Sequence, residues 1–262
     1  MRRSLAFLYG LAAYALFFGS FTYAIGFVGN LFVPKSIDSG PAGPAGAAAL
    51  IDAALLVLFA AQHSGMARPG FKRWWTRLVP EPIERSTYVL LASSALVLLF
   101  ALWRPIPAPV WHAEAPAAVA LLWTLFALGW ATVFLSTFMI GHANLFGLEQ
   151  VWRHLRSRVR PPDHFRTPGL YRLVRHPIMV GFLIAFWATP SMTAGHLLFA
   201  VATTGYILLA VQLEERDLMA HFGERYRRYR REVRAFLPLP RRTPANRSAP
   251  EGEPEPEAEI AR

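Results

Sequence analysis

"LYRLVRHPIMVGFLIAFW", residues 170–187, changes from a basic loop to an apolar run within a few positions. The change occurs at Arg175-His176-Pro177. Proline is favoured in the first turn of a helix, where its missing N–H has no partner to lose, so an apolar helix is expected to begin here. Arg175 and His176 then lie at the mouth of that helix. The side of a membrane that this mouth faces determines what they can contact.

Apolar segments dominate the rest of the chain, which has 262 residues and is 54% hydrophobic. Several of these segments approach the roughly 20 residues that span a bilayer. The fifth is short, and only "TPSMTAG" separates it from the sixth, which predicts a tight helical hairpin whose far tip need not cross the whole membrane. The predicted fold class is all-α, a polytopic membrane protein with about six transmembrane helices. The six segments cover approximately residues 5–33, 47–62, 87–103, 117–140, 178–190 and 193–213.

The composition narrows the classes of site and partner. The chain has no Cys, which excludes disulfides, thiolate metal sites and a Cys nucleophile. Its formal net charge is +10, mostly from Arg. In a membrane protein such an excess usually sets topology and meets anionic lipid. We therefore expect membrane lipid, and no nucleic acid, as a partner, whereas the oligomeric state is left open.

Basic residues alternate strictly between the loops. The N-terminus, the loops after the second and fourth segments and the C-terminal region are rich in Arg and Lys. The other loops are poor, with Lys35 after the first segment, Arg104 after the third and no basic residue after the fifth. Because basic loops stay on the cytoplasmic side, this alternation predicts an integral, multi-pass protein with both termini in the cytoplasm.

The segment after the last apolar run, "HFGERYRRYRREVRAFLPLP", carries an amphipathic pattern. Phe222, Tyr226, Tyr229, Val233 and Phe236 fall on one face at helical spacing. One interpretation is an interfacial helix on the inner leaflet, and another is that it also closes over a site. Residues 1–240 are thus predicted to form one membrane-embedded domain. Residues 241–262 are rich in Pro, Glu and Ala and are predicted to be disordered.

Polar motifs far apart in the sequence fall at the same, cytoplasmic level of this topology. Such groups near a membrane are unfavourable unless paired or lining a cavity, so a shared polar chamber is expected. Arg175 and the free amides of the following helix would form an anion site there. The alternatives are a purely topogenic Arg175, hydrogen-bonding histidines at helix ends, Glu214 and Glu215 bridging to the Arg-rich helix that follows, or a haem ligand; zinc-type spacing is missing. The motifs are Gln62-His63-Ser64, His142 with Asn144, Arg175-His176-Pro177 and Glu214-Glu215.

The C-terminal motifs resemble those of a known superfamily. "RHP", Gly181, "LEERDL", "FG", two spaced Tyr and "FLP" are similar to the isoprenylcysteine carboxyl methyltransferase and phospholipid methyltransferase superfamily over residues 170–238. "AQHSGMARPGFKRWW", "HANLFGLEQVW" and "FWATPSMTAGHLLFA" resemble the nurim-related branch. Within that branch, residues 1–236 look most like the bacterial methanethiol S-methyltransferases, which convert methanethiol to dimethyl sulfide.

This resemblance implies an enzyme that uses S-adenosylmethionine, with the cofactor-binding part at about residues 142–238. The implied cofactor contacts are Arg175, His176, Pro177, Gly181, Glu214, Glu215, Tyr226 and Tyr229. The superfamily often has Tyr two residues after the Pro, where this chain has Met179, so a tyrosine contact is not carried over.

Methylation of a small volatile thiol requires help with deprotonation, because the thiolate is the reactive form. The candidate bases are His63, His142 and His176; alternatively, the positive charge of the fourth loop favours the anion. Two other functions stay open. One is a methyltransferase with a lipid or isoprenyl-type acceptor. The other is a non-enzymatic membrane protein, either nurim-like or an accessory to nitrogen-oxide metabolism.

Overall fold

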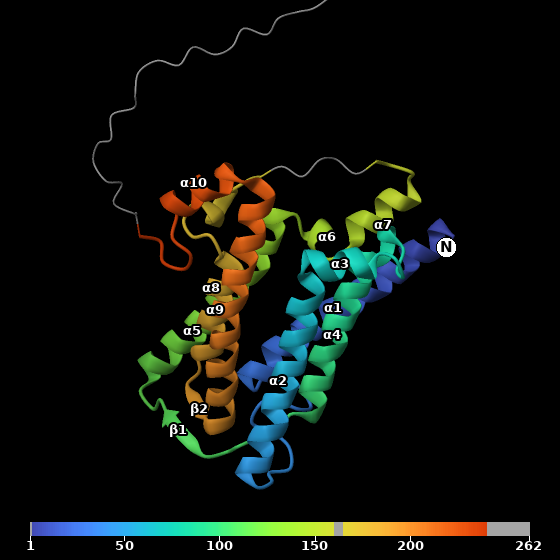
Figure 1. The fold of residues 1–262 in the computed structure, drawn as a ribbon. Helices are drawn as coiled ribbons and strands as arrows, with labels where there is room; N and C mark the ends of the chain where they lie inside the picture. Colours follow the sequence, from blue (N-terminus) through green and yellow to red (C-terminus); the bar gives the residue numbers. More distant parts are fainter. Residues whose placement is uncertain (1, 160–164, 240–262) are drawn as a thin grey trace, which may run out of the picture.

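The computed structural model describes residues 2–159 and 165–239 (Figure 1). The predicted disordered tail, residues 241–262, lies outside this part of the chain. The elements in order are α1 (Arg3–Gly29), α2 (Ala45–Ala67), α3 (Pro69–Trp75), α4 (Glu81–Leu102), β1 (Pro109–His112), α5 (Pro116–Ile140), α6 (His142–Leu145), α7 (Leu148–Leu155), η1 (Gly169–Arg172), α8 (Pro177–Trp187), β2 (Ser191–Thr193), α9 (Ala194–Phe222) and α10 (Glu224–Glu232).

Five of the described helices, α1, α2, α4, α5 and α9, are long and apolar enough to cross a membrane. Large apolar side chains such as Leu50 and Leu121 are exposed on their outer faces, as expected of helices surrounded by lipid. The fifth predicted segment, which was expected to be short, is α8, and it has only 11 residues. At about 1.5 Å per residue it reaches roughly 16 Å, about half the hydrocarbon thickness. The all-α, polytopic fold class is confirmed, with five long helices and one short one.

The tip of the predicted α8–α9 hairpin contains a small antiparallel sheet that the sequence did not predict. β2 pairs with β1 from the α4–α5 connection, with Pro109 opposite Thr193 and Trp111 opposite Met192. The backbone bond from Ala194 N–H to the Ala108 carbonyl, 2.8 Å, extends the contact. The pairing satisfies backbone groups where the short helix ends.

The two ends of the bundle differ in the elements they carry (Figure 1). The N-terminus, α3, α6, α7 and α10 lie at one end, and β1 and β2 lie at the other. Arg3 at the start of α1 donates a hydrogen bond to the Ser157 hydroxyl, which follows α7. The basic segments therefore gather at the end that carries α10, as the loop alternation predicted.

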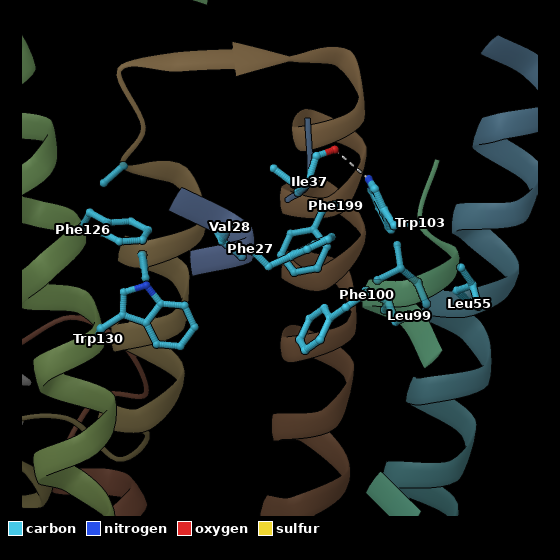
Figure 2. Close-up of a cluster of buried hydrophobic side chains, with 13 residues drawn as sticks. Phe27, Val28, Ile37, Leu55, Leu99, Phe100, Trp103, Phe126, Trp130 and Phe199 are labelled. Carbon is cyan, nitrogen blue, oxygen red and sulfur yellow. Dashed lines mark hydrogen bonds between the residues drawn. The ribbon is translucent and has the colours of Figure 1, made fainter. Parts of the chain in front are cut away.

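A cluster of aromatic and aliphatic side chains closes the bundle toward the β1–β2 end (Figure 2). Trp103, which follows α4, is fully buried and donates its indole N–H to the Ile37 carbonyl at 3.1 Å. Phe27 and Phe199 meet the same indole edge-on, with ring centroids 6.1 and 5.8 Å away. α1, α4 and α9 are thereby packed together.

Glycines allow α5 and α8 to cross in direct contact. A Cβ at Gly181 would lie 2.6 Å from the Gly129 carbonyl oxygen, and a Cβ at Gly129 would lie 2.7 Å from the Ala185 nitrogen. Such distances are shorter than van der Waals contact, so glycine is required on both helices. The contact holds the short α8 against a full-length span and thereby fixes the position of its N-terminus.

The C-terminal segment folds back on the start of α8. α9 ends at Phe222 and is followed by Gly223, whose φ of +57° favours glycine, and α10 ends at Glu232. The predicted helical face through Val233 and Phe236 is therefore too long. The chain from Val233 onward is non-helical instead, and Val233 itself has extended backbone angles. Its Arg234 carbonyl accepts a 2.9 Å hydrogen bond from the backbone N–H of Arg175.

Candidate active site

Glu215 is the centre of a buried group of charges at the α10 end of the bundle. Its Oε1 accepts hydrogen bonds from Arg175 Nε at 2.7 Å and lies 3.1 Å from His176 Nε2. Its Oε2 lies 3.0 Å from Arg230 Nε of α10. The Glu215 side chain is only 7% exposed. One carboxylate on α9 thus joins the mouth of α8 to α10.

Arg175 uses its guanidinium donors within the protein. Besides Glu215, it donates to the carbonyls of Arg230 and Val233. Its side chain is only 5% exposed, so the guanidinium is not open to a ligand in this arrangement. These contacts support a positioning role for Arg175, in which it fastens the segment after α10 to α8 and holds Glu215.

Glu214 differs from its neighbour in its accessibility. Its side chain is 48% exposed, and its closest ion-pair contact is with His176 Nδ1 at 3.6 Å. His176 therefore lies between two carboxylates, one buried and one accessible. Because the Glu214 contact is long, its carboxylate retains acceptor capacity for a hydroxyl or ammonium group.

Tyr226 and Tyr229 of α10 form the aromatic cover of this charge cluster. Both are buried, and both pack against Phe165. Burial raises the pKa of Tyr229 to about 12, and it raises the pKa of Tyr226 further, so both phenols stay protonated at neutral pH. Tyr229 donates to the Tyr171 carbonyl, whereas the Tyr226 hydroxyl is buried with no hydrogen-bond partner among the described residues.

The positions of Pro177 and Gly181, two predicted cofactor contacts, are explained largely by the start of α8 and by its packing against α5. Pro177 is the first residue of α8 and is fully buried, and no side chain caps this helix. Its first-turn amides are thus left beside the charge cluster, as the anion-site prediction requires. Gly181 lies one turn further, at the α5 crossing, and its close approach to Gly129 explains the glycine without a ligand.

His63 lies near the end of α2 in a second polar group. The Tyr88 hydroxyl of α4 is 3.1 Å from each of its ring nitrogens. The next residue, Ser64, shares a 2.9 Å hydrogen bond with the hydroxyl of Tyr206 on α9. Arg68, just after α2, also pairs with Asp217 of α9 at 2.8 Å. The motif at residues 62–64 is thus joined to α9, the helix whose Glu214 and Glu215 contact His176.

His142 has different neighbours. Its Nε2 lies 2.8 Å from the Tyr14 hydroxyl on α1, and its Nδ1 lies 2.8 Å from the Thr137 hydroxyl on α5. Phe138 stacks on its ring. Desolvation lowers the pKa of His142, which favours the neutral ring. None of the contacts described for it includes a residue of the Glu215 cluster, so the expected single chamber does not extend to His142 by direct contact.

A cavity of about 380 Å³ lies at the same end of the bundle, among α3, α4, α6 and α7. Asn144, the other polar residue predicted after the fourth span, lines it together with Gln150, Arg85 and Arg153. Asn144 accepts a 2.7 Å hydrogen bond from the Gln150 amide. Asn144 thus belongs to this cavity rather than to the Glu215 cluster.

Several members of the site were not predicted from the sequence. Pairing of the C-terminal Arg-rich helix with Glu214 and Glu215 was an open alternative, but charge alone did not show that Arg230 is the Arg that pairs with Glu215. Tyr88 and Tyr206 lie inside apolar spans, and the presence of a hydroxyl group within such a span could have marked them as site residues. Tyr171 and Phe165 come from a loop without periodicity.

The residues present fit a polar, zwitterionic cofactor. The buried Tyr226 hydroxyl needs a partner, because an unpaired buried hydroxyl is unfavourable. The half-exposed Glu214 carboxylate provides an acceptor, and the uncapped α8 terminus provides donors. S-adenosylmethionine has hydroxyl, ammonium and carboxylate groups that match these three features.

Comparison with known proteins places the chain in a family. Residues 52–235 match the family model described as NnrU protein. The chain is 58% identical to the methanethiol S-methyltransferase of Mycobacterium tuberculosis (strain ATCC 25618 / H37Rv), an alignment that covers 92% of this chain and 99% of the relative. It is 52% identical to the methanethiol S-methyltransferase of Pseudomonas deceptionensis, with 91% of each chain covered.

A more distant relative is the nurim of Sus scrofa, 35% identical over 64% of this chain and 66% of that protein. No solved structure matches the chain. The resemblances found in the sequence to the nurim-related branch and to the methanethiol S-methyltransferases are both confirmed. The chain belongs to the NnrU protein family, as a relative of the methanethiol S-methyltransferases.

Proposed function

We propose that this protein is an S-adenosylmethionine-dependent methyltransferase that converts methanethiol to dimethyl sulfide. The observation that carries this proposal is the similarity along nearly the whole chain to proteins named methanethiol S-methyltransferase. The polar end of the bundle supports it, because the buried, unpaired Tyr226 hydroxyl and the accessible Glu214 carboxylate suit the polar groups of the cofactor.

Each residue of the charge cluster has a role in this proposal. Glu214 and Tyr226 contact the cofactor, and the α8 terminus at Pro177 attracts its carboxylate through free amides. Arg175 and Glu215 hold that terminus and α10 in place. When bound, the cofactor supplies an electrophilic methyl group, and the protein holds the acceptor in line with it and excludes water.

The site opens to the cytoplasm in this proposal, and both termini lie on that side. The Arg- and Lys-rich segments gather at the end of the bundle that carries α10, and such segments are retained on the cytoplasmic side. A C-terminal fluorescent fusion that folds in the cytoplasm should be bright. A C-terminal alkaline phosphatase fusion that is active instead would contradict this orientation.

The function is tested with the purified full chain in lipid nanodiscs, supplied with S-adenosylmethionine and methanethiol. We expect dimethyl sulfide in the headspace by gas chromatography. Glu214→Gln should raise the KM for the cofactor about tenfold or more, because a hydrogen bond to a charged group contributes about 1.5–3 kcal/mol. Glu224→Gln is the matched control, since Glu224 is an exposed carboxylate on α10.

Two results would count against the proposal in different ways. Folded wild-type protein that forms no dimethyl sulfide would remove the thiol as substrate. Equal KM values for Glu214→Gln and Glu224→Gln would leave the reaction standing and remove Glu214 from the cofactor site.

A further inference from the structure

We propose that the thiol is bound and deprotonated at a subsite on α2 and α4 formed by His63, Tyr88 and Arg85, with His63 as the base. This acceptor subsite rests on the proposed function and extends it to the second substrate. A base needs a ring nitrogen with a free lone pair, and the hydrogen-bond partners of the three predicted histidines determine which of them has one.

His176 is not suited to accept a proton. Its Nε2 lies 3.1 Å from Glu215, and its Nδ1 lies 3.6 Å from Glu214. His176 is buried and both of its ring nitrogens face carboxylate oxygens of the cofactor site, so neither is directed at a second substrate. His176 is therefore a positioning residue of the cofactor site.

The lone pair of the His142 ring already accepts a hydrogen bond from Tyr14. The Thr137 hydroxyl donates to the Phe134 carbonyl at 2.7 Å, so it can only accept from His142 Nδ1–H. Nε2 is then the acceptor, and the Tyr14 hydroxyl occupies it at 2.8 Å. Both ring nitrogens have protein partners, and a thiol would have to displace one of them.

His63 differs because one hydroxyl faces both of its nitrogens. Tyr88 Oη is 3.1 Å from Nδ1 and 3.1 Å from Nε2, and it is also 3.3 Å from the His63 carbonyl. One hydroxyl bonds with good geometry to one ring nitrogen at a time. When this hydroxyl donates to the His63 carbonyl, it accepts from one ring N–H, and the other nitrogen, which has no second protein partner among the contacts described, keeps a lone pair for a substrate proton.

The surroundings of His63 match a small thiol. Phe59 stacks on the imidazole with ring centroids 5.2 Å apart, which gives the methyl group an apolar wall. Arg85 lies over the ring of Tyr88, the tyrosine that contacts His63, with its guanidinium carbon 4.8 Å from the ring centroid. A nearby guanidinium favours a thiolate over a thiol. The subsite thus combines an apolar surface, a base and a cation.

The subsite lies beside the cofactor residues. Ser64 bonds to Tyr206 of α9 at 2.9 Å, and Arg68 pairs with Asp217 of α9 at 2.8 Å. These contacts join the end of α2 to the part of α9 that carries Glu214. The thiol would thus meet the methyl group between α2 and α9.

The S–H proton of methanethiol moves to the free nitrogen of His63, and the sulfur keeps the electron pair. The thiolate forms a new S–CH3 bond while the bond between the methyl group and the sulfonium sulfur breaks, with its electrons left on that sulfur. Dimethyl sulfide and a neutral thioether product leave, and His63 releases the proton to water.

The test compares His63→Asn with the wild type and with His112→Asn, a matched histidine exposed on β1 at the opposite end. At pH 7 we expect His63→Asn to lose about 100-fold or more in turnover, the usual contribution of a general base. Its rate should then rise about tenfold per pH unit toward pH 9, because the unassisted thiol ionises in solution. S-adenosylhomocysteine affinity, measured by calorimetry, should stay within about twofold of the wild-type value in both variants.

Tyr88→Phe keeps the test decisive if His63→Asn does not fold. It removes only the hydroxyl that orients His63, and we expect a fall in kcat with the wild-type pH profile and unchanged S-adenosylhomocysteine affinity. Wild-type turnover at pH 7 in His63→Asn, or wild-type kcat in Tyr88→Phe, would overturn the acceptor subsite while dimethyl sulfide formation by the wild type preserves the proposed function. A wild-type chain that makes no dimethyl sulfide would overturn both.

Discussion

The end of the bundle near β1 and β2 and the end that carries α10 are held together by different forces. At the first, Trp103 is enclosed by Phe27 and Phe199, and the only polar atom of its side chain donates a hydrogen bond to a backbone carbonyl (Figure 2). At the second, a buried carboxylate, Glu215, is shared by two arginines and a histidine.

The contacts at one end are best explained by stability, and those at the other end by function. Aromatic packing stabilises without requiring any group to be ionised, and small changes are felt because protein interiors are close-packed. A buried ion pair is often no more stable than an apolar replacement, since both charges lose their hydration. The charges at the α10 end are therefore poor candidates for pure stabilisers, and they are better explained by a polar ligand.

The largest expected effect is at Glu215. Glu215→Gln leaves the buried Arg175 without its countercharge and removes the ion-pair partner of the half-exposed Arg230. Removing one partner of a buried ion pair costs about 3–5 kcal/mol, so we expect a fall of this size in the free energy of unfolding. Denaturant titration in micelles measures it, with the exposed Glu232→Gln as control. A fall of less than about 1 kcal/mol in the free energy of unfolding would show that the cluster does not hold α8, α9 and α10 together.

A smaller effect is expected at the aromatic end. Trp103→Phe leaves the Ile37 carbonyl without its donor, and an unsatisfied buried group costs about 1–3 kcal/mol. The free energy of unfolding should fall by this amount, whereas turnover per folded molecule should stay within about twofold of the wild type. A loss of turnover in folded protein would mean that the two ends are not independent.

The smallest effect on stability is expected for Tyr226→Phe. Because the hydroxyl is buried and has no partner among the described residues, its removal should leave the free energy of unfolding unchanged or raise it by about 1 kcal/mol. The affinity for S-adenosylhomocysteine should fall about fivefold to tenfold, the loss of one hydrogen bond of about 1–1.5 kcal/mol. Calorimetry that finds unchanged affinity would remove Tyr226 from the cofactor site.

Much of the fold follows from local properties of the chain. Apolar length predicted the five long spans, and the alternation of Arg and Lys predicted that the basic segments gather at one end. The convergence of Arg175, His176 and Glu215 was predicted from their common depth in the membrane, and that depth follows from the topology alone. The short α8 was foreseen as a weak span, but the β1–β2 pairing at its end depends on backbone bonds between segments about 80 residues apart.

The sequence by itself determined which residues lie in the membrane, which lie at its surface, and which motifs share a level. Only the tertiary structure decided that Arg230 reaches Glu215, that His142 faces Tyr14, and that His63 faces Tyr88. Depth in a membrane depends on summed hydrophobicity and charge, which are properties of the residues themselves. Contact depends on the rotation of each helix about its axis and on how closely its neighbours approach, as Gly129 and Gly181 show for α5 and α8.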